Sequence, residues 1–309
     1  MTEKNQKSKY WVVVILLVLV LGIISVIITG FVGLIFMGEE ATVSGNVAVI
    51  DVQGVLVTAA DGVFASSMAS SPDLVKLIEK AGQDDSVKAV VFMINSPGGS
   101  AVASDEVATA VKALNKTTVA VIRDMGTSGA YWVASATDHV IANRASFTGS
   151  IGVIASYLEV PGLLEEYNVT YRRLVAGKYK DMGSPFKEMT SEEQRIFQES
   201  LDELHDVFIH EVAANRKMSY DSVKELATGA FYTGMKAEEL GLVDELGGKQ
   251  EAKRYLEKTL NTTVSFKPYK RPKSFVETLM TGVSEQSYGM GRGMGDALLD
   301  AENNAVIRT

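Results

Sequence analysis

The chain has 309 residues, a formal net charge of -8 and no cysteine. The lack of cysteine excludes disulfides, thiolate metal sites and a cysteine nucleophile. No block rich in lysine and arginine lies beyond the N-terminus, so we expect no nucleic-acid partner. With 46% hydrophobic residues, the chain can build the core of one α/β domain with a helical extension.

An apolar run at residues 11–37, close to the N-terminus, contains no charged residue. A helix crosses a membrane core in about 20 residues, whereas the apolar part of a cleaved signal peptide has about 7–15. Lysines precede the run and two glutamates follow it, which favours a cytoplasmic N-terminus. We therefore expect a cytoplasmic segment at 1–10, a single transmembrane anchor in the cell membrane at 11–37, and an extracytoplasmic domain beyond it.

Apolar, β-branched segments alternate with helical patterns from residue 47 onward. Repeated β-then-α units predict an α/β fold with a mostly parallel sheet that is covered on both faces. In such sheets active sites gather at the carboxyl ends of the strands. The predicted strands lie at 47–51, 89–94, 118–123, 139–142 and 169–175, and the predicted helices at 73–81, 128–136 and 162–167.

A helical extension follows from Thr190. Thr190 and Glu193 match a capping box, and apolar residues recur at helical spacing as far as Lys217. Shorter helices are expected at 220–227, 236–240 and 249–260. The last residues, 270–309, show no packing pattern and predict a flexible tail. Such a tail is either an ordinary disordered terminus or a segment that enters the substrate groove and is trimmed there.

Ser128 stands between a predicted strand and a predicted helix. A serine at this place is either an ordinary N-cap or a nucleophile held where the first helical N–H groups are unpaired. A second motif, Ser-Pro-Gly-Gly at 96–99, also ends a buried strand. Paired glycines let backbone N–H groups approach a ligand, as an oxyanion hole requires. Two strand ends that offer backbone donors beside a hydroxyl together favour the nucleophile.

A serine nucleophile needs a base, and the chain offers three histidines and several lysines. His139 opens an apolar strand, while His205 and His210 lie on different faces of the long helix, so each of the three is interpreted as structural or solvated. A desolvated lysine is the alternative, because its pKa can fall until the amine is neutral at about pH 7. Lys178 and Lys180 follow a predicted strand, although spacing alone favours exposed loop charges for both.

Residues 184–187 match the Ser-x-x-Lys pattern of penicillin-recognising acylases. That chemistry needs both side chains on one helical turn, and the partner motifs Ser-Asp-Asn and Lys-Thr-Gly are absent from the sequence. This pattern is therefore disfavoured as the source of a nucleophile.

Four segments occur in a fixed order: NSPGG at 95–99, GTSGAYWVAS at 126–135, TGSIGVI at 148–154 and GKYKDMGSPF at 177–186. In this order and spacing they resemble the signal peptide peptidase A family, membrane-anchored Ser/Lys peptidases of the S49 type. The resemblance covers a peptidase domain at about residues 45–260 and implies a Clp- and crotonase-like fold of repeated β-β-α units. Because the chain has no internal repeat, it resembles the short form of the family.

The resemblance implies a role for five residues. Ser128 is the expected nucleophile, Lys180 the expected general base, and Ser150 the residue expected to orient the lysine. The backbone N–H groups of Gly99 and Gly129 are expected to form the oxyanion hole. No metal or cofactor is implied.

The resemblance also implies an assembly and a substrate. Short-form members form a ring of subunits, octamer-like, in which the serine of one chain meets the lysine of its neighbour. Such a membrane-anchored ring suits a serine endopeptidase that hydrolyses remnant signal peptides and similar apolar peptides. One departure is Ala130, where the family often has glycine, and its methyl group is expected to narrow the site.

Two other functions remain open. A related membrane serine protease pairs with a stomatin-like partner, but that family usually adds further spans after the protease domain. A non-catalytic membrane scaffold would keep the crotonase-like fold for binding or assembly. A crotonase acting on acyl-CoA is disfavoured by the expected extracytoplasmic location.

Overall fold

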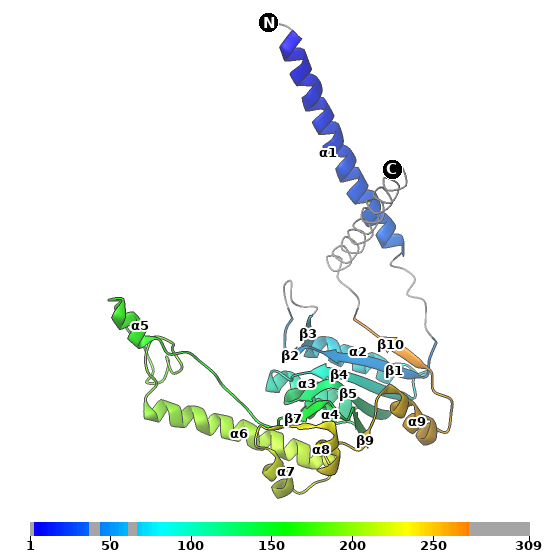
Figure 1. Ribbon diagram of the computed structural model, residues 1–309, viewed down its shortest axis with the longest axis vertical. Helices are drawn as coiled ribbons and strands as arrows, with labels where there is room; N and C mark the ends of the chain where they lie inside the picture. The colour runs from blue at the N-terminus through cyan, green and yellow to red at the C-terminus, as the bar shows by residue number, and fades with distance from the viewer. Residues whose placement is uncertain (1–2, 37–43, 61–66, 272–309) are drawn as a thin grey trace, which may run out of the picture. The chain divides into compact units, whose positions relative to one another are not determined.

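The computed structural model describes residues 3–36, 44–60 and 67–271, which fall into two units (Figure 1). One unit contains helix α1 (Glu3–Phe36), and the other runs from Ser44 to Arg271. Side chains of α1 are described at residues 11 and 14–30, where most are apolar and exposed. Among the described residues no helix is long and apolar enough to cross a membrane, so the predicted anchor is not confirmed. Most of the predicted tail lies outside the described residues.

A mostly parallel sheet lies at the centre of the second unit, as the β-then-α pattern predicts. Its described strands run in the order β10-β1-β4-β5-β6-β9, while β7 pairs with β5 and β8 with β7. Of the described pairs, only β7 with β8 is antiparallel. The strands are β1 (Val47–Gln53), β2 (Val55–Val57), β3 (Met68–Ser70), β4 (Ala89–Ser96), β5 (Thr117–Thr127), β6 (His139–Ala142), β7 (Phe147–Gly149), β8 (Phe231–Thr233), β9 (Glu245–Leu246) and β10 (Phe266–Tyr269).

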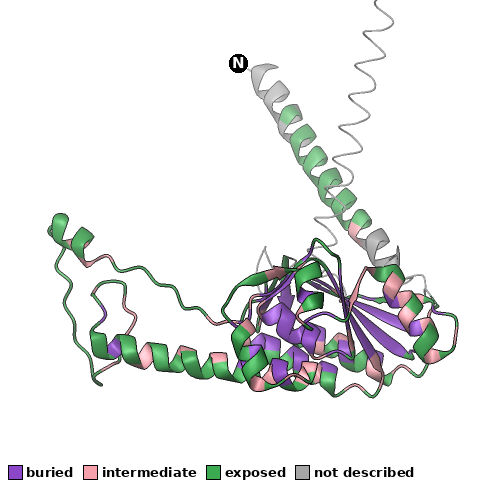
Figure 2. Ribbon diagram, turned by 60° about the horizontal axis from the view of Figure 1, so that its bottom comes forward, coloured by how far each residue is buried: buried purple, intermediate pink, exposed green. Residues whose placement is uncertain are grey.

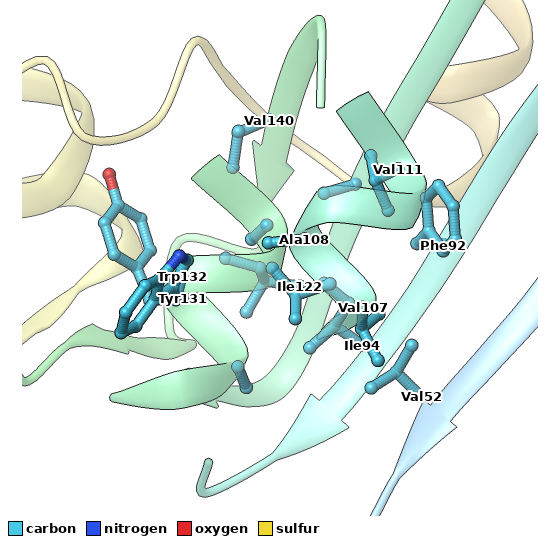
Figure 3. Close-up of a cluster of buried hydrophobic side chains, with 14 of the residues drawn as sticks. Val52, Phe92, Ile94, Val107, Ala108, Val111, Ile122, Tyr131, Trp132 and Val140 are labelled. Atoms are coloured by element: carbon cyan, nitrogen blue, oxygen red, sulfur yellow. The ribbon is translucent and has the colours of Figure 1, made fainter. Parts of the chain in front are cut away.

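Helices cover both faces of this sheet, which explains why its central strands are apolar throughout. Successive side chains of a strand point to opposite faces, so Phe92 and Ile94 join one buried cluster and Val91 the other. Figure 3 shows Phe92 and Ile94 among side chains of the helices on the first face. The helices on that face include α2 (Ser71–Gln83), α3 (Ala101–Lys112) and α4 (Gly129–Ser135), and α9 (Lys249–Leu260) covers the other.

Helix α6 (Ser191–Arg216) begins where the sequence predicts and extends beyond the sheet. The Thr190 hydroxyl accepts a hydrogen bond from the Glu193 N–H, and the Glu193 carboxylate accepts one from the Thr190 N–H, so the capping box forms. The C-terminal half of α6 packs on α4, where the rings of Phe208 and Trp132 stack with centroids 4.8 Å apart. The shorter helices α7 (Tyr220–Leu226) and α8 (Gly234–Glu239) follow it.

Residues 152–190 form an arm that connects β7 to α6 and is mostly exposed (Figure 2). Its one described helix, α5 (Pro161–Glu166), lies well away from the sheet (Figure 1). The strand predicted at 169–175 is wrong, because this segment is irregular and pairs with no strand among the described residues. A strand needs a neighbour for its backbone N–H and C=O groups, and the arm offers none.

Candidate active site

Ser128 lies at the carboxyl end of β5, with a backbone conformation that few residues other than glycine adopt. Its φ and ψ are 53° and -127°, and its N–H donates to the Gly149 carbonyl at 2.8 Å. Its carbonyl accepts from the N–H groups of Tyr131 and Trp132 at the start of α4. The Ser128 side chain makes no capping hydrogen bond and is half-buried. The N-cap alternative is therefore not realised, and the hydroxyl is left for another task.

The glycines after β4 pack against the residues around Ser128. Gly98 has a φ of 94°, and a Cβ there would lie 2.7 Å from the Gly129 nitrogen and 2.9 Å from the Ser128 Cβ. The Gly99 nitrogen lies 3.4 Å from the place that a Cβ on Gly129 would take. Close approach of the two strand ends thus requires glycine at position 98, while glycine at 129 is required because a Cβ there would lie 2.1 Å from the Ser104 hydroxyl oxygen of α3.

Two backbone donors meet beside Ser128 without partners of their own. Within the described part of the chain, neither the Gly99 N–H nor the Gly129 N–H makes a hydrogen bond. Leu56 of β2 fixes the glycine loop at residues 97–99, because the Leu56 N–H donates to the Gly98 carbonyl at 2.8 Å. Its carbonyl accepts from the Ser100 N–H at 2.9 Å. Unpaired N–H groups beside a hydroxyl are the arrangement that an oxyanion hole needs.

Ser150 lies next to Ser128 on the neighbouring strand end. Thr127 of β5 is in register with Gly149 of β7, so the next residue of each strand is a serine. Ser150 also has a positive φ, 51°, and its hydroxyl donates to the Gly229 carbonyl at 3.1 Å. The structure brings the two serines together, while a role of Ser150 toward a lysine stays a prediction.

Lys180 lies on the arm and is exposed. Its N–H closes a turn on the Gly177 carbonyl at 3.2 Å, and its side chain makes no hydrogen bond with Ser128 within the described chain. Lys178, the other candidate, pairs with Glu192 at 2.5 Å, which raises the pKa of the Lys178 amine. A raised pKa keeps the amine protonated, so Lys178 is a poor base. The structure thus does not bring Lys180 to Ser128 within one chain.

The other candidate bases lie elsewhere. The His139 ring stacks on Tyr255 with centroids 3.9 Å apart and lies 3.4 Å from a Glu245 oxygen, which is a structural environment. Residues 184–187 form no helical turn, and the Lys187 amine pairs with Glu193 at 2.7 Å. The Ser-x-x-Lys arrangement of the acylases is therefore excluded. Ala130 is fully buried in the core, so its methyl group does not narrow an open pocket as expected.

Residues 110–263 match peptidase family S49. A Methanocaldococcus jannaschii protein provisionally named a protease is 34% identical over 248 residues, which are 78% of this chain and 78% of the relative. An Enterococcus faecium protein provisionally named a signal peptide peptidase is 33% identical over 73% of this chain and 67% of its own length. The chain belongs to peptidase family S49. The mixed α/β fold with its largely parallel sheet fits this assignment.

A third relative bears on the activity of the S49 domain. The chloroplastic serine protease SPPA of Arabidopsis thaliana is 28% identical over 85% of this chain, which spans 39% of that longer protein. Family membership and these relatives together make the chain a serine peptidase.

Sequence reasoning missed Leu56 and Thr127, which hold the candidate site together. Leu56 bridges to Gly99, and the Thr127 hydroxyl donates to the Pro97 carbonyl at 3.1 Å. The apolar triplet at 55–57 is a weak strand signal that could have indicated β2. No local pattern indicates that β2 would contact the glycine loop.

Proposed function

We propose that this protein is a membrane-anchored serine endopeptidase in which Ser128 is the nucleophile and Lys180 the general base. The observation that carries the proposal is the strained Ser128 beside the unpaired N–H groups of Gly99 and Gly129. Backbone donors fixed before reaction stabilise the oxyanion that forms when a serine attacks a peptide carbonyl. Each such donor lowers the barrier by about 3–4 kcal/mol.

The chemistry requires one group that both takes and gives a proton. A neutral Lys180 amine takes the proton of the Ser128 hydroxyl as its oxygen attacks, and passes it to the amine that leaves. The Lys180 amine then removes a proton from water as the water attacks the acyl-enzyme. It passes this proton to the Ser128 oxygen when the ester bond breaks, which returns Ser128 to its hydroxyl form. Ser150, next to Ser128, is suited to accept a hydrogen bond from the lysine and fix its direction.

We infer that Lys180 reaches the serine of a neighbouring copy in a ring. The arm that carries it exposes apolar side chains to solvent, and Ile154 and Leu174 are 88% and 98% exposed. Apolar surface of this kind is typical of a segment that a partner covers. A base supplied by the next subunit also accounts for the separation of Lys180 from Ser128 in one chain.

The N-terminus and the substrate complete the proposal. The uncharged run at 11–37 is proposed to anchor the protein with its N-terminus in the cytoplasm and the S49 domain outside. The name of the Enterococcus faecium relative supports signal peptides as substrates, and we propose that these are the remnants left after preprotein processing. Family membership and the converging donors favour this function over a non-catalytic scaffold.

A mixing experiment tests the dyad on the full-length protein in detergent, with a fluorogenic apolar signal-peptide-like substrate. Ser128→Ala and Lys180→Ala are each expected to lose activity, and the two variants reassembled together are expected to recover part of it. Lys178→Ala is the matched control and is expected to remain active. Full activity of Lys180→Ala would discard the lysine mechanism, and two inactive variants without recovery would place both groups in one chain.

A further inference from the structure

Strand β5 carries a bulge just before Ser128. Ile94 of β4 pairs with Ile122 of β5, but the next paired residues are Ser96 and Gly126. Two steps along β4 therefore correspond to four steps along β5, and residues 123–125 bulge. A bulge bends its strand and re-aims the side chains that follow.

At this bulge β5 changes its neighbour. Residues 119–122 pair with β6, whereas residues 125–127 pair with β7. Pairing with β7 leads directly to the hydrogen bond between the Ser128 N–H and the Gly149 carbonyl. The direction in which Ser128 leaves the sheet therefore depends on the bulge.

Two side chains make hydrogen bonds with the bulge and the residue before it. The Asn95 Oδ1 accepts from the Met125 N–H at 3.2 Å, and its Nδ2 donates to the Asp124 carboxylate at 3.1 Å. The Ser146 hydroxyl donates to the carbonyls of Ile122 and Arg123. The bulge offers Asn95 one donor and one acceptor, and an amide serves both at once.

Asn95 also joins the bulge to the loop that carries the oxyanion donors. The backbone carbonyl of Asn95 accepts a hydrogen bond from the Gly54 N–H at 3.2 Å. Gly54 precedes β2, the strand whose Leu56 N–H donates to the Gly98 carbonyl. Two residues later, the Pro97 carbonyl accepts from the Thr127 hydroxyl. Asn95 lies near the end of β4, and its side chain contacts the end of β5. The distance between these two strand ends sets the distance between the Ser128 hydroxyl and the backbone donors.

We propose that Asn95 is a positioning residue, which sets Ser128 against the Gly99 and Gly129 donors by holding the bulge at 123–125. The proposal rests on the peptidase function proposed above. A misplacement of about 1 Å can cost about a hundredfold in rate. Since its hydrogen bonds go to the bulge, loss of the amide is expected to lower kcat and to leave KM unchanged.

The test exchanges the two partners of one hydrogen bond in the full-length protein. Asn95→Asp keeps the acceptor for the Met125 N–H but sets two carboxylates against each other, so we expect kcat to fall about tenfold to a hundredfold. Asn95→Asp with Asp124→Asn restores a donor and an acceptor in reversed order, so we expect kcat to recover to within about threefold of wild type. Asn215→Asp, at an amide that donates to Ser135, is the matched charge control.

Labelling of Ser128 by a fluorophosphonate separates the outcomes, since the reagent depends on the nucleophile and its donors. Slow labelling by Asn95→Asp with rescue by the exchange supports the proposal, provided that thermal unfolding of the exchanged variant matches wild type. Wild-type labelling and kcat in Asn95→Asp would overturn the role of Asn95 alone. So would a loss of equal size in Asn215→Asp, or no rescue. No labelling of the wild-type protein would instead overturn the peptidase function itself.

Discussion

The sheet end that carries Ser128 and the arm that carries Lys180 are held in opposite ways. Around Ser128, strands β2, β4, β5 and β7 are tied by backbone hydrogen bonds, and the residues that follow it are buried in the core. The arm has one short described helix and exposes apolar side chains along most of its length. The part of the proposed site at Ser128 is therefore fixed by contacts within the chain, whereas the position of Lys180 is not fixed by packing against the sheet.

The difference separates two kinds of preorganisation. Backbone donors must be fixed before reaction, because they lower the barrier only if they need no rearrangement. In the proposed ring, a base on the arm is delivered by assembly, and activity would then depend on association. Changes at the sheet end should therefore act on the chemistry in every subunit, while changes on the arm should act through association.

The largest expected effect comes from breaking the sheet end with Gly98→Ala. Gly98 has a φ of 94°, and because a Cβ there would make contacts of 2.7–2.9 Å, it would push Ser128 and Gly129 away from the glycine loop. We expect kcat to fall about a hundredfold or more, with a loss of about 1–3 kcal/mol in unfolding free energy. Gly162→Ala on the arm is the control, since a Cβ there meets nothing within 4 Å. Equal kcat in the two variants would contradict the proposed geometry.

An intermediate effect is expected from Leu174→Ser on the arm. Because Leu174 is 98% exposed, the unfolding free energy of the isolated subunit should change by less than about 0.5 kcal/mol. If a neighbour covers this side chain, association should weaken by about 1–3 kcal/mol, and activity should fall as the protein is diluted.

Analytical ultracentrifugation across a concentration series measures this effect. Met235→Ser, at a 51% exposed position of α8, is the matched control. An arm variant that associates as wild type does would remove the arm from the proposed interface.

The smallest expected effect is a difference between Asp84 and Asp181 in how much each contributes to stability as the pH falls. Hydrogen bonds from Ser86, Tyr269 and Lys267 hold the pKa of Asp84 well below its usual range. Arg173 lowers the pKa of Asp181 on the arm. A depressed folded-state pKa stabilises the fold above the unfolded pKa of about 3.9, and that contribution is lost as the pH falls toward the folded value.

Thermal unfolding between about pH 7 and pH 2 should show the contrast. Asp84 ties the loop after α2 to β10, so Asp84→Asn should be less stable at neutral pH and should lose less stability on acidification than wild type. Asp181→Asn should follow the wild-type curve, since its partner lies eight residues away on the same exposed arm. Parallel curves for wild type and Asp84→Asn would remove Asp84 from the acid response.

Features that depend on neighbouring residues in the sequence could be predicted, whereas features that depend on pairing between distant segments could not. The strands predicted at 89–94 and 118–123 and the capping box at Thr190 follow from local patterns that the structure confirms, although β4 continues to Ser96 and β5 to Thr127. The segment 169–175 has strand composition, yet only a neighbouring strand could have made it one. The bulge at 123–125 is a property of pairing between β4 and β5, so no local pattern indicates it.

The candidate site divides in the same way. Ser128 and Gly99 follow strands that the sequence predicts, and parallel pairing brings these two strand ends to one edge, so their proximity could be predicted. Ser150 follows β7, which is not among the predicted strands, so only the family resemblance indicates a place for Ser150 beside Ser128. The separation of Lys180 from Ser128 could not be predicted, because the arm is irregular and mostly exposed, so no periodic pattern or packing against the sheet indicates its course.

The backbone of Ser128 has a consequence for how this sequence balances folding against chemistry. A residue other than glycine at a φ of 53° and a ψ of -127° costs about 1–3 kcal/mol, a noticeable fraction of the stability of an ordinary domain. A sequence optimised for folding alone would place glycine at this position, and it would lose the hydroxyl. The hydrogen bonds among the strand ends around Ser128 stabilise the fold enough to tolerate the strained backbone of this residue.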